Sequence, residues 1–276
     1  MTTALSIEHL SISFGGLKAL DDLSFAIEEN QIYGLIGPNG AGKTTVFNCV
    51  TQFYKPDQGR VLFTADPDRL GRWTKKAVPS GDGRAVIDLV GLPVHEIIRF
   101  GLVRTFQNVE VVPELTLADN VLLGGHVDFK ATMAEQMLRL PRARREEKAY
   151  RAKALDVLGF LGIAGLANQP AGGQPYGVLK KLEMARTLMA EPRLIILDEP
   201  AAGLNDSETE DLAALIRHIR DQYQAAILLV EHDMRLVMSV CERICAISFG
   251  KFLAEGAPAD IQRDKLVQEA YLGEQE

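Results

Sequence analysis

The stretch Gly37-Pro-Asn-Gly-Ala-Gly-Lys-Thr-Thr45 decides the fold, because it matches the phosphate-binding pattern G-x-x-x-x-G-K-[ST]. An apolar run at 31–36 precedes this phosphate loop, and Val-Phe-Asn-Cys-Val at 46–50 follows it. We therefore expect a strand, a glycine-rich turn and a helix in that order. Glycine lacks a Cβ atom, so successive backbone N–H groups can point at one phosphate, and the helix N-terminus adds partial positive charge.

The phosphate loop predicts that the chain binds a nucleoside triphosphate. Lys43 can reach the β- and γ-phosphates, and the Thr44 hydroxyl can hold Mg²⁺. A glycine-rich turn that binds nothing is the alternative, and the length of the match disfavours it. The residues that we expect to contact the nucleotide here are Gly37, Asn39, Gly40, Gly42, Lys43, Thr44 and Thr45.

The composition favours a globular protein with a sizeable core. Of the 276 residues, 47% are hydrophobic and 24% are charged, and the net charge of -7 argues against a dedicated nucleic-acid binder. No apolar run approaches the roughly 20 residues of a membrane-spanning helix, and the N-terminus lacks the layout of a signal peptide. We expect a soluble, cytoplasmic chain that reaches a membrane only through a partner. Cys49, Cys241 and Cys245 form no CxxC pair, which predicts buried reduced thiols.

Two strands are expected before the phosphate loop. Alternating residues at 5–14 and apolar residues within 19–27 predict an antiparallel pair around the Gly15-Gly16 turn. Phe14 lies directly before that turn, where its ring could stack on a base; a core phenylalanine is an equal alternative. The later segment 65–85 has neither helical nor strand period and is expected to be a long surface loop.

The middle of the chain has helical periodicity. It begins near residue 117, and an amphipathic helix is expected at 178–190. The sequence therefore predicts an α/β core formed by 1–107 and 191–276, with a helical subdomain, 108–190, inserted into it.

Two apolar runs end in titratable side chains. Leu194-Ile-Ile-Leu197 leads to Asp198 and Glu199, and the run at 225–230 leads to Glu231-His-Asp233. Apolar runs of this kind predict buried parallel strands, and ligands of such sheets bind at the carboxyl ends of the strands.

Phosphoryl transfer to water gives these side chains possible roles. Asp198 could hold Mg²⁺ together with Thr44, and Glu199 could act as general base on the attacking water. His232 could contact the γ-phosphate or that water. A histidine after a strand is more often structural, but the phosphate loop and the acid pair favour a functional role here.

With these residues in place, the chain resembles the ATP-binding subunits of ABC transporters, and most of all those that energise uptake of branched-chain amino acids. The resemblance spans nearly the whole chain and keeps the family's motif order. The stretches that carry it are 36–48, Arg104-Thr-Phe-Gln-Asn108, Asp198-Glu-Pro-Ala-Ala-Gly-Leu-Asn205, Glu231-His-Asp-Met-Arg-Leu-Val-Met238 and Ala270-Tyr-Leu-Gly273.

The resemblance implies a P-loop NTPase (RecA-like) core with an N-terminal antiparallel β-subdomain and an inserted α-helical subdomain. It implies ATP and Mg²⁺ as cofactors, with Phe14 stacking on adenine. It further implies that Thr44, Gln107 and Asp198 hold Mg²⁺ and that Glu199, His232 and Gln107 act in catalysis. The expected partners are a second ATPase subunit, two multi-pass membrane permease subunits and, indirectly, a periplasmic or extracellular binding protein. The expected location is the cytoplasmic face of the inner (plasma) membrane.

One motif departs from the family. The signature, usually Leu-Ser-Gly-Gly-Gln, aligns with Gln174-Pro-Tyr-Gly-Val178, in which only Gly177 is plainly retained. Pro175 has no N–H to donate, and Val178 replaces an amide side chain. In the family, this motif reaches the γ-phosphate bound by the other chain of a head-to-tail dimer. We therefore expect a non-identical ATPase partner and two unequal nucleotide sites, unless the backbone N–H groups near Gly177 suffice.

Three other classes of protein remain as alternatives. One is the ATPase of a lipid or lipopolysaccharide exporter, which shares this layout. Another is an ABC-type ATPase that acts on DNA or the ribosome, which would need a coiled coil, paired cassettes or a basic surface. A nucleotide kinase or GTPase would carry other base or lid motifs.

Overall fold

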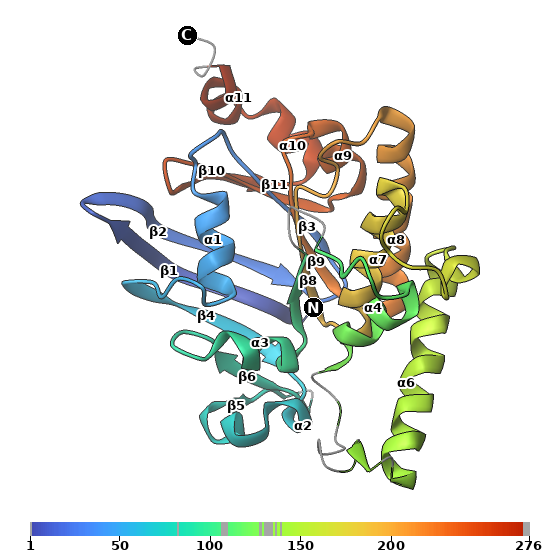
Figure 1. Ribbon diagram of the computed structural model, residues 1–276. Coiled ribbons are helices and arrows are strands. Elements are labelled where there is room, and N and C mark those ends of the chain that lie inside the picture. The colour runs from blue at the N-terminus through green and yellow to red at the C-terminus, as the bar shows by residue number, and fades with distance from the viewer. Residues whose placement is uncertain are drawn as a thin grey trace. The chain divides into compact units, whose positions relative to one another are not determined.

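The computed structural model describes residues 2–81, 83–105, 110–126, 129, 135, 137, 138 and 140–272. The chain divides into two compact units (Figure 1). Unit 1 comprises Met1–Arg104 and Arg193–Glu276, and unit 2 comprises Thr105–Pro192.

A six-stranded, mostly parallel sheet forms the centre of unit 1. Its order is β11-β10-β3-β9-β8-β7, and all neighbours except β10 and β11 are parallel. The strands β3, β8 and β9 are buried at every residue, which explains their continuous apolar sequences. The strand bounds are β3 Ile32–Ile36, β7 Leu102–Arg104, β8 Leu194–Asp198, β9 Ala226–Val230, β10 Arg243–Ser248 and β11 Lys251–Gly256.

A second sheet in unit 1 is antiparallel and has the order β2-β1-β4-β6-β5. Its first two strands confirm the expected pair at the N-terminus. The strand bounds are β1 Thr3–Phe14, β2 Leu17–Glu28, β4 Gln58–Ala65, β5 Val78–Pro79 and β6 Ala85–Asp88. The sequence analysis missed the short strands β5, β6 and β7, which are too brief to show a period.

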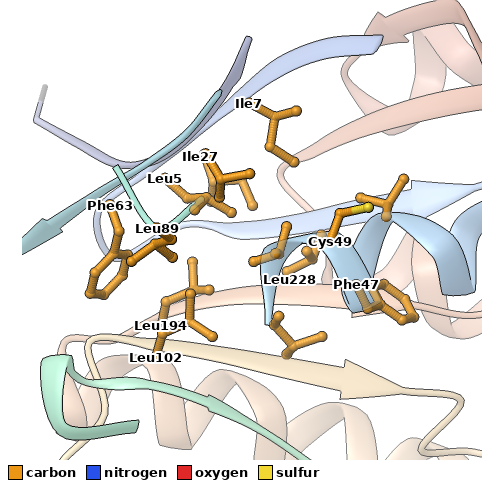
Figure 2. Packing of buried hydrophobic residues seen from close by; sticks show 14 of the residues in the cluster. Leu5, Ile7, Ile27, Phe47, Cys49, Phe63, Leu89, Leu102, Leu194 and Leu228 are labelled. Atoms are coloured by element: carbon orange, nitrogen blue, oxygen red, sulfur yellow. The ribbon is translucent and has the colours of Figure 1, made fainter. Parts of the chain in front are cut away.

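The main core joins both sheets to one helix (Figure 2). Side chains of α1, Lys43–Val50, pack with those of the antiparallel strands and with those of the parallel sheet. The labelled residues include Leu5 and Ile27 from the antiparallel sheet, Phe47 from α1 and Leu228 from the parallel sheet. Because the helix that follows the phosphate loop is packed into this core, the loop is held at a fixed place.

The prediction of a surface loop at 65–85 is wrong. This segment forms α2 Pro67–Leu70, the 3-10 helix η1 Gly71–Lys76 and strand β5 before it enters β6. Leu70 is buried, and Asp66 lies 2.6 Å from the guanidinium of Arg193. Elements of two to six residues are stabilised by these tertiary contacts, and the local sequence carries no sign of the contacts.

The remaining helices of unit 1 include one long helix, α8. Asn205 caps α8 through a capping box with Glu208, so the helix starts at Asp206. The helix bounds are α3 Val94–Phe100, α8 Asp206–Tyr223, α9 Met234–Val240, α10 Pro258–Arg263 and α11 Lys265–Leu272.

Unit 2 is helical in its described part. It contains α4 Leu117–Gly124, α6 Pro141–Phe160, the 3-10 helix η3 Ala164–Leu166 and α7 Tyr176–Met189. A Cβ atom on Gly124 would lie 2.1 Å from the carbonyl oxygen of Arg186, so α4 and α7 are packed closely. The fully buried Asn120 amide bonds to the backbone at Val112, Leu115 and Thr116 and fixes the chain before α4. Among the described residues, no helix is both long and apolar enough to cross a membrane.

Candidate active site

The phosphate loop leaves the buried strand β3 and ends at α1. Gly40 and Gly42 have φ values of 75° and 105°, which favour glycine, and Gly42 is the N-cap of α1. A Cβ atom on Gly37 would lie 2.3 Å from the carbonyl oxygen of Ile247 in β10. The N–H of Gly250 donates to the carbonyl of Ala41 at 2.9 Å, so the β10–β11 turn also contacts the loop. Packing within this chain therefore requires glycine at position 37, and the positive φ values favour it at positions 40 and 42.

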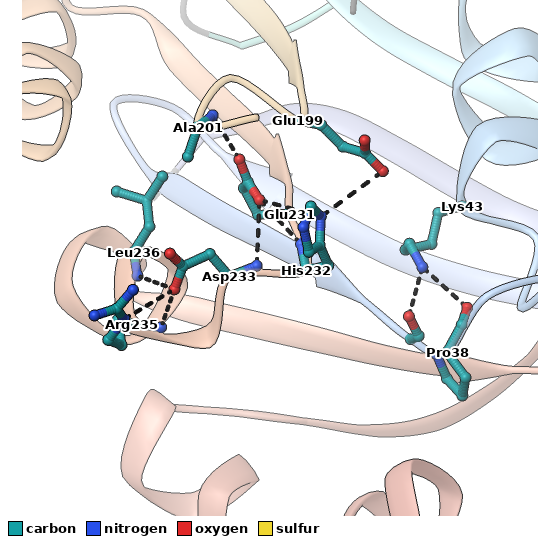
Figure 3. Close-up of polar contacts among 10 residues, drawn as sticks. Pro38, Lys43, Glu199, Ala201, Glu231, His232, Asp233, Arg235 and Leu236 are labelled. Carbon is teal, nitrogen blue, oxygen red and sulfur yellow. Dashed lines mark hydrogen bonds and ion pairs between the residues drawn. The ribbon is translucent and has the colours of Figure 1, made fainter. Parts of the chain in front are cut away.

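The cationic side chain of the loop lies within the loop itself. Lys43 Nζ donates to the carbonyl oxygens of Gly37 and Pro38, the second at 3.0 Å (Figure 3). In the part of the chain that the structure describes, no side chain caps α1, and the first turn of this helix contains no acidic residue. A cation and uncapped helix N–H groups form an anion-binding arrangement. Asn39 and Thr44 are exposed and Thr45 is half-buried beside them.

The acidic side chains lie at the same edge of the sheet as the phosphate loop. The strand β9 lies between β3 and β8, and all three run parallel. Val230, the last residue of β9, pairs with Leu35 in β3 and with Asp198 in β8. The three strands therefore deliver the phosphate loop, the Asp198-Glu199 pair and the Glu231-His-Asp233 stretch to one edge.

Asp198 has a cationic partner that the sequence analysis did not assign. Arg104 Nη2 lies 2.8 Å from Asp198 Oδ2, and Arg104 Nη1 donates to Asn48 Oδ1 at 2.8 Å. The same guanidinium lies over the ring of Phe47, 5.5 Å from its centroid. The pairing joins residues 94 positions apart, so the sequence around β7 carries no sign of it.

The oxygen groups suit Mg²⁺ held jointly with a nucleotide. Thr44 offers a hydroxyl and Asp198 a carboxylate, both hard ligands. Within the described part of the chain, no group of three or more His, Cys, Asp or Glu side chains could hold a metal ion alone. Mg²⁺ commonly takes only one or two protein ligands beside substrate phosphates, so these residues fit that ion.

Glu199 has an unusual backbone conformation. Its φ is 47°, a value that L-residues rarely adopt, and its N–H donates to the carbonyl of Val230 at 2.9 Å. Its carboxylate Oε1 lies 4.0 Å from Nδ1 of His232, whose side chain is 65% exposed. Figure 3 shows these two side chains pointing toward one another. Strain of this kind is concentrated at functional sites, where the surrounding structure maintains it.

The sequence analysis gave no role to Glu231, and the structure places it at the centre of this site. Its side chain is fully buried. Its two carboxylate oxygens accept hydrogen bonds from the N–H groups of Ala201, His232 and Asp233. The available signal was a charged residue directly after an apolar strand, where burial would demand partners.

The remaining predicted residues lie elsewhere. Phe14 ends β1, is 44% exposed, and makes an edge-to-face contact with Tyr54, with ring centroids 5.1 Å apart. Gly177 lies in unit 2, exposed in the first turn of α7, which starts two residues earlier than expected, after Pro175 as N-cap. Gln107 is outside the described residues.

Comparison with protein families establishes the class. A family model described as "ABC transporter" matches residues 20–202, which is most of the chain. A second, described as "Branched-chain amino acid ATP-binding cassette transporter", matches residues 253–276. The chain belongs to the ABC transporter family as an ATP-binding cassette, an ATPase, which confirms the resemblance seen in the sequence.

Individual relatives agree with this class. The chain is 42% identical over 98% of both chains to the high-affinity branched-chain amino acid transport ATP-binding protein BraF of Pseudomonas aeruginosa. It is 39% identical, with the same coverage, to the corresponding protein LivG of Escherichia coli K12. It is also 30% identical over 98% of both chains to the lipopolysaccharide export system ATP-binding protein LptB of Haemophilus influenzae.

A solved structure confirms the predicted fold. The crystal structure of the ADP conformation of an ATP-binding cassette of an ABC transporter matches with a TM-score of 0.78 and 28% identity. The match covers 99% of this chain and 100% of that chain. The P-loop core with an antiparallel sheet and helical segments is thus the fold of an ABC cassette.

Proposed function

We propose that this chain is the ATP-hydrolysing subunit of an ABC importer for branched-chain amino acids or a related small polar or aromatic-acid substrate. The observation that carries the ATP-hydrolysing role is the arrangement at one sheet edge, where Glu199 Oε1 lies 4.0 Å from His232 Nδ1. The phosphate loop, which carries Lys43, lies at the same edge of the sheet. The importer role is supported by the 42% and 39% identity to uptake proteins.

The chain's own residues account for the binding of ATP. The γ- and β-phosphate oxygens replace the carbonyls of Gly37 and Pro38 as acceptors for Lys43 Nζ, and the uncapped N-terminus of α1 adds N–H donors. Phe14 is half-exposed next to a turn and can offer its ring to adenine. Thr44, Gln107 and Asp198 would hold Mg²⁺, which neutralises phosphate charge when bound.

Hydrolysis then needs a base and a positioned water. Water attacks the γ-phosphorus, the bond from that phosphorus to the β–γ bridging oxygen breaks, and ADP and phosphate leave. Glu199 accepts the proton of the water, and His232 contacts the γ-phosphate or the water from the opposite loop. Because ATP bound between two chains favours their closed state, hydrolysis and release return them to the open state.

The partners follow from this role. Unit 2 is proposed as the helical subdomain that meets two multi-pass permease subunits at the cytoplasmic face of the membrane, with a substrate-binding protein on the other side. A second ATPase subunit would pair with this chain. That partner is proposed to be a different chain, because the signature Gln174-Pro-Tyr-Gly-Val178 departs from the family pattern.

The second candidate function is ATP hydrolysis for a lipopolysaccharide exporter. Only the similarity to the export ATPase LptB favours it. The uptake relatives are 42% and 39% identical, against 30% for the export ATPase. The match of residues 253–276 to the branched-chain amino acid cassette also favours uptake. Purification of the tagged chain in gentle detergent, with its companions identified by mass, separates the two. Two permeases and a second ATPase support uptake, and exporter subunits contradict it.

Glu199→Gln in that purified complex tests the chemistry. Loss of a general base costs about 10²- to 10⁴-fold in turnover, while ATP binding remains. The exposed Glu210→Gln in α8 is the matched control and should leave turnover unchanged. The corresponding change in the partner should spare much of the turnover if the two sites are unequal. Equal losses in the two subunits would contradict the unequal-site proposal.

A further inference from the structure

Glu231 is a buried carboxylate whose oxygens join two separate loops. Its Oε1 accepts from the N–H of Ala201 at 2.7 Å, and its Oε2 accepts from the N–H groups of His232 at 3.0 Å and Asp233 at 3.3 Å (Figure 3). Ala201 lies in the loop after β8, two residues beyond Glu199. His232 and Asp233 lie in the loop after β9, so one side chain spans the ends of neighbouring strands.

Burying the Glu231 carboxylate costs free energy, so the site depends on a specific set of hydrogen-bond donors. A fully buried carboxylate loses its hydration, and only hydrogen bonds to its charged form offset that cost. Three backbone donors from two loops supply those bonds. If either loop shifts, part of the carboxylate is left without partners in a site from which water is excluded.

The anchoring fixes the backbones that carry the two catalytic side chains. On the far side of His232, Asp233 caps α9 by accepting from the N–H groups of Arg235 and Leu236. Hydrogen bonds to Glu231 and to the first turn of α9 thus hold the backbone on both sides of His232. The side chain of His232 is nevertheless 65% exposed. The Glu199 backbone is bonded to Val230 at the end of β9 and followed by the anchored Ala201.

We infer that Glu231 is a positioning residue that sets the separation of Glu199 and His232 by holding both of their loops. This inference rests on the proposed function, because it assumes that Glu199 and His232 act together in ATP hydrolysis. Glu231 acts through the two loops that it joins. Its Oε2 also lies 3.7 Å from Nδ1 of His232, so the same carboxylate helps to orient that imidazole.

Glu231→Gln tests the inference in the full chain within its purified complex, with Mg²⁺ and ATP as the probe. A glutamine amide keeps the size of the side chain but has one acceptor oxygen, so it can satisfy one loop and not both. We expect kcat to fall about 10- to 100-fold through misplacement of the catalytic groups. The KM for ATP should stay within about twofold, because Lys43 and the phosphate loop are untouched.

Two controls separate positioning from general destabilisation. Ile216→Val removes one buried methyl group from α8 and should lower the melting temperature without lowering kcat. In a double-mutant cycle, Glu231→Gln combined with His232→Ala should lose less turnover than the product of the two single losses, because coupled residues are non-additive. Additive losses, or a Glu231→Gln variant with the kcat of the unmodified chain, would overturn the inference.

A measurement on the unmodified chain covers the case in which Glu231→Gln does not fold. Hydrogen exchange with residue resolution should show slow exchange together at the amides of Ala201, His232 and Asp233. Rapid exchange at any of the three would contradict the inference. Failure of the proposed function looks different, because then Glu199→Gln and His232→Ala would themselves leave turnover unchanged.

Discussion

The phosphate loop of unit 1 and the signature segment of unit 2 both contain glycine, and each leads into a helix. Each helix lacks a side-chain cap at its N-terminus, α1 after Gly42 and α7 after Pro175. The glycines differ in what surrounds them. A Cβ atom on Gly37 would meet a backbone oxygen at 2.3 Å, whereas one on Gly177 would meet nothing within 4 Å.

The difference separates two reasons for a glycine. Gly37 is required because this chain's own strand β10 lies against it. Gly177 has no such neighbour and does not have a positive φ, so nothing in its own unit requires a glycine there. Its identity is explained if another molecule approaches its backbone, which agrees with the proposal that the signature reaches a nucleotide held by the partner subunit.

Gly37→Ala should have the largest effect. The added methyl group would collide with the carbonyl of Ile247, and overpacking of this kind destabilises by about 3 kcal/mol. Distortion of the loop should also abolish ATP binding, measured by equilibrium titration of the purified chain. Gly81→Ala is the matched control, because a Cβ atom there meets nothing within 4 Å and its φ is not positive. A Gly37→Ala variant that binds ATP normally would refute this explanation of Gly37.

Thiol labelling can show where that damage occurs, because all three cysteines belong to unit 1. Burial raises the pKa of the Cys49 thiol to about 12, and the same cause acts on Cys241 and Cys245. At pH 8 the folded chain should therefore react slowly with a thiol reagent. Gly37→Ala should speed the reaction at Cys49 in α1, directly behind the phosphate loop.

Gly177→Ala, unlike Gly37→Ala, should impair function without lowering the stability of the chain. Alanine is favoured over glycine within a helix by roughly 0.5–1 kcal/mol, so the free energy of unfolding should be unchanged or higher. Thiol labelling should stay slow. ATP-dependent association of the two ATPase subunits should nevertheless weaken about tenfold, the loss expected when a methyl group blocks one backbone contact of about 1.4 kcal/mol to the γ-phosphate held by the partner. Unchanged association would contradict the role proposed for this chain's signature.

The difference between local patterns and contacts with distant residues also explains what could be predicted from the sequence. The phosphate loop, the buried strands and the acids at their ends follow from local patterns, and the structure confirms these elements. Arg104 and Glu231 were not assigned, because Arg104 pairs with the distant Asp198 and Glu231 reaches the distant Ala201. The segment 65–85 was wrongly expected to be a loop, since tertiary contacts stabilise its short elements and no sequence period marks them.

The segment 65–85 is a third region, and changes there should have the smallest effect on activity. Trp73 in η1 packs against the core, and Arg72 and Lys76 lie over its ring at 5.1 and 4.7 Å from the centroid. Trp73→Ala should therefore lower the free energy of unfolding by about 1–2 kcal/mol and leave kcat for ATP unchanged. Thermal denaturation and steady-state hydrolysis on the same preparation measure both effects.

Trp73→Phe sharpens that test, because the indole Nε1 is buried and has no hydrogen-bond partner among the described residues. Leaving a buried donor unsatisfied costs about 1–3 kcal/mol, and phenylalanine keeps much of the ring contact without the donor. The variant should therefore be at least as stable as the unmodified chain. If instead Trp73→Ala lowered kcat while Trp73→Phe did not, the ring would be coupled to the hydrolysis site, and the segment would join the phosphate loop as a region on which activity depends.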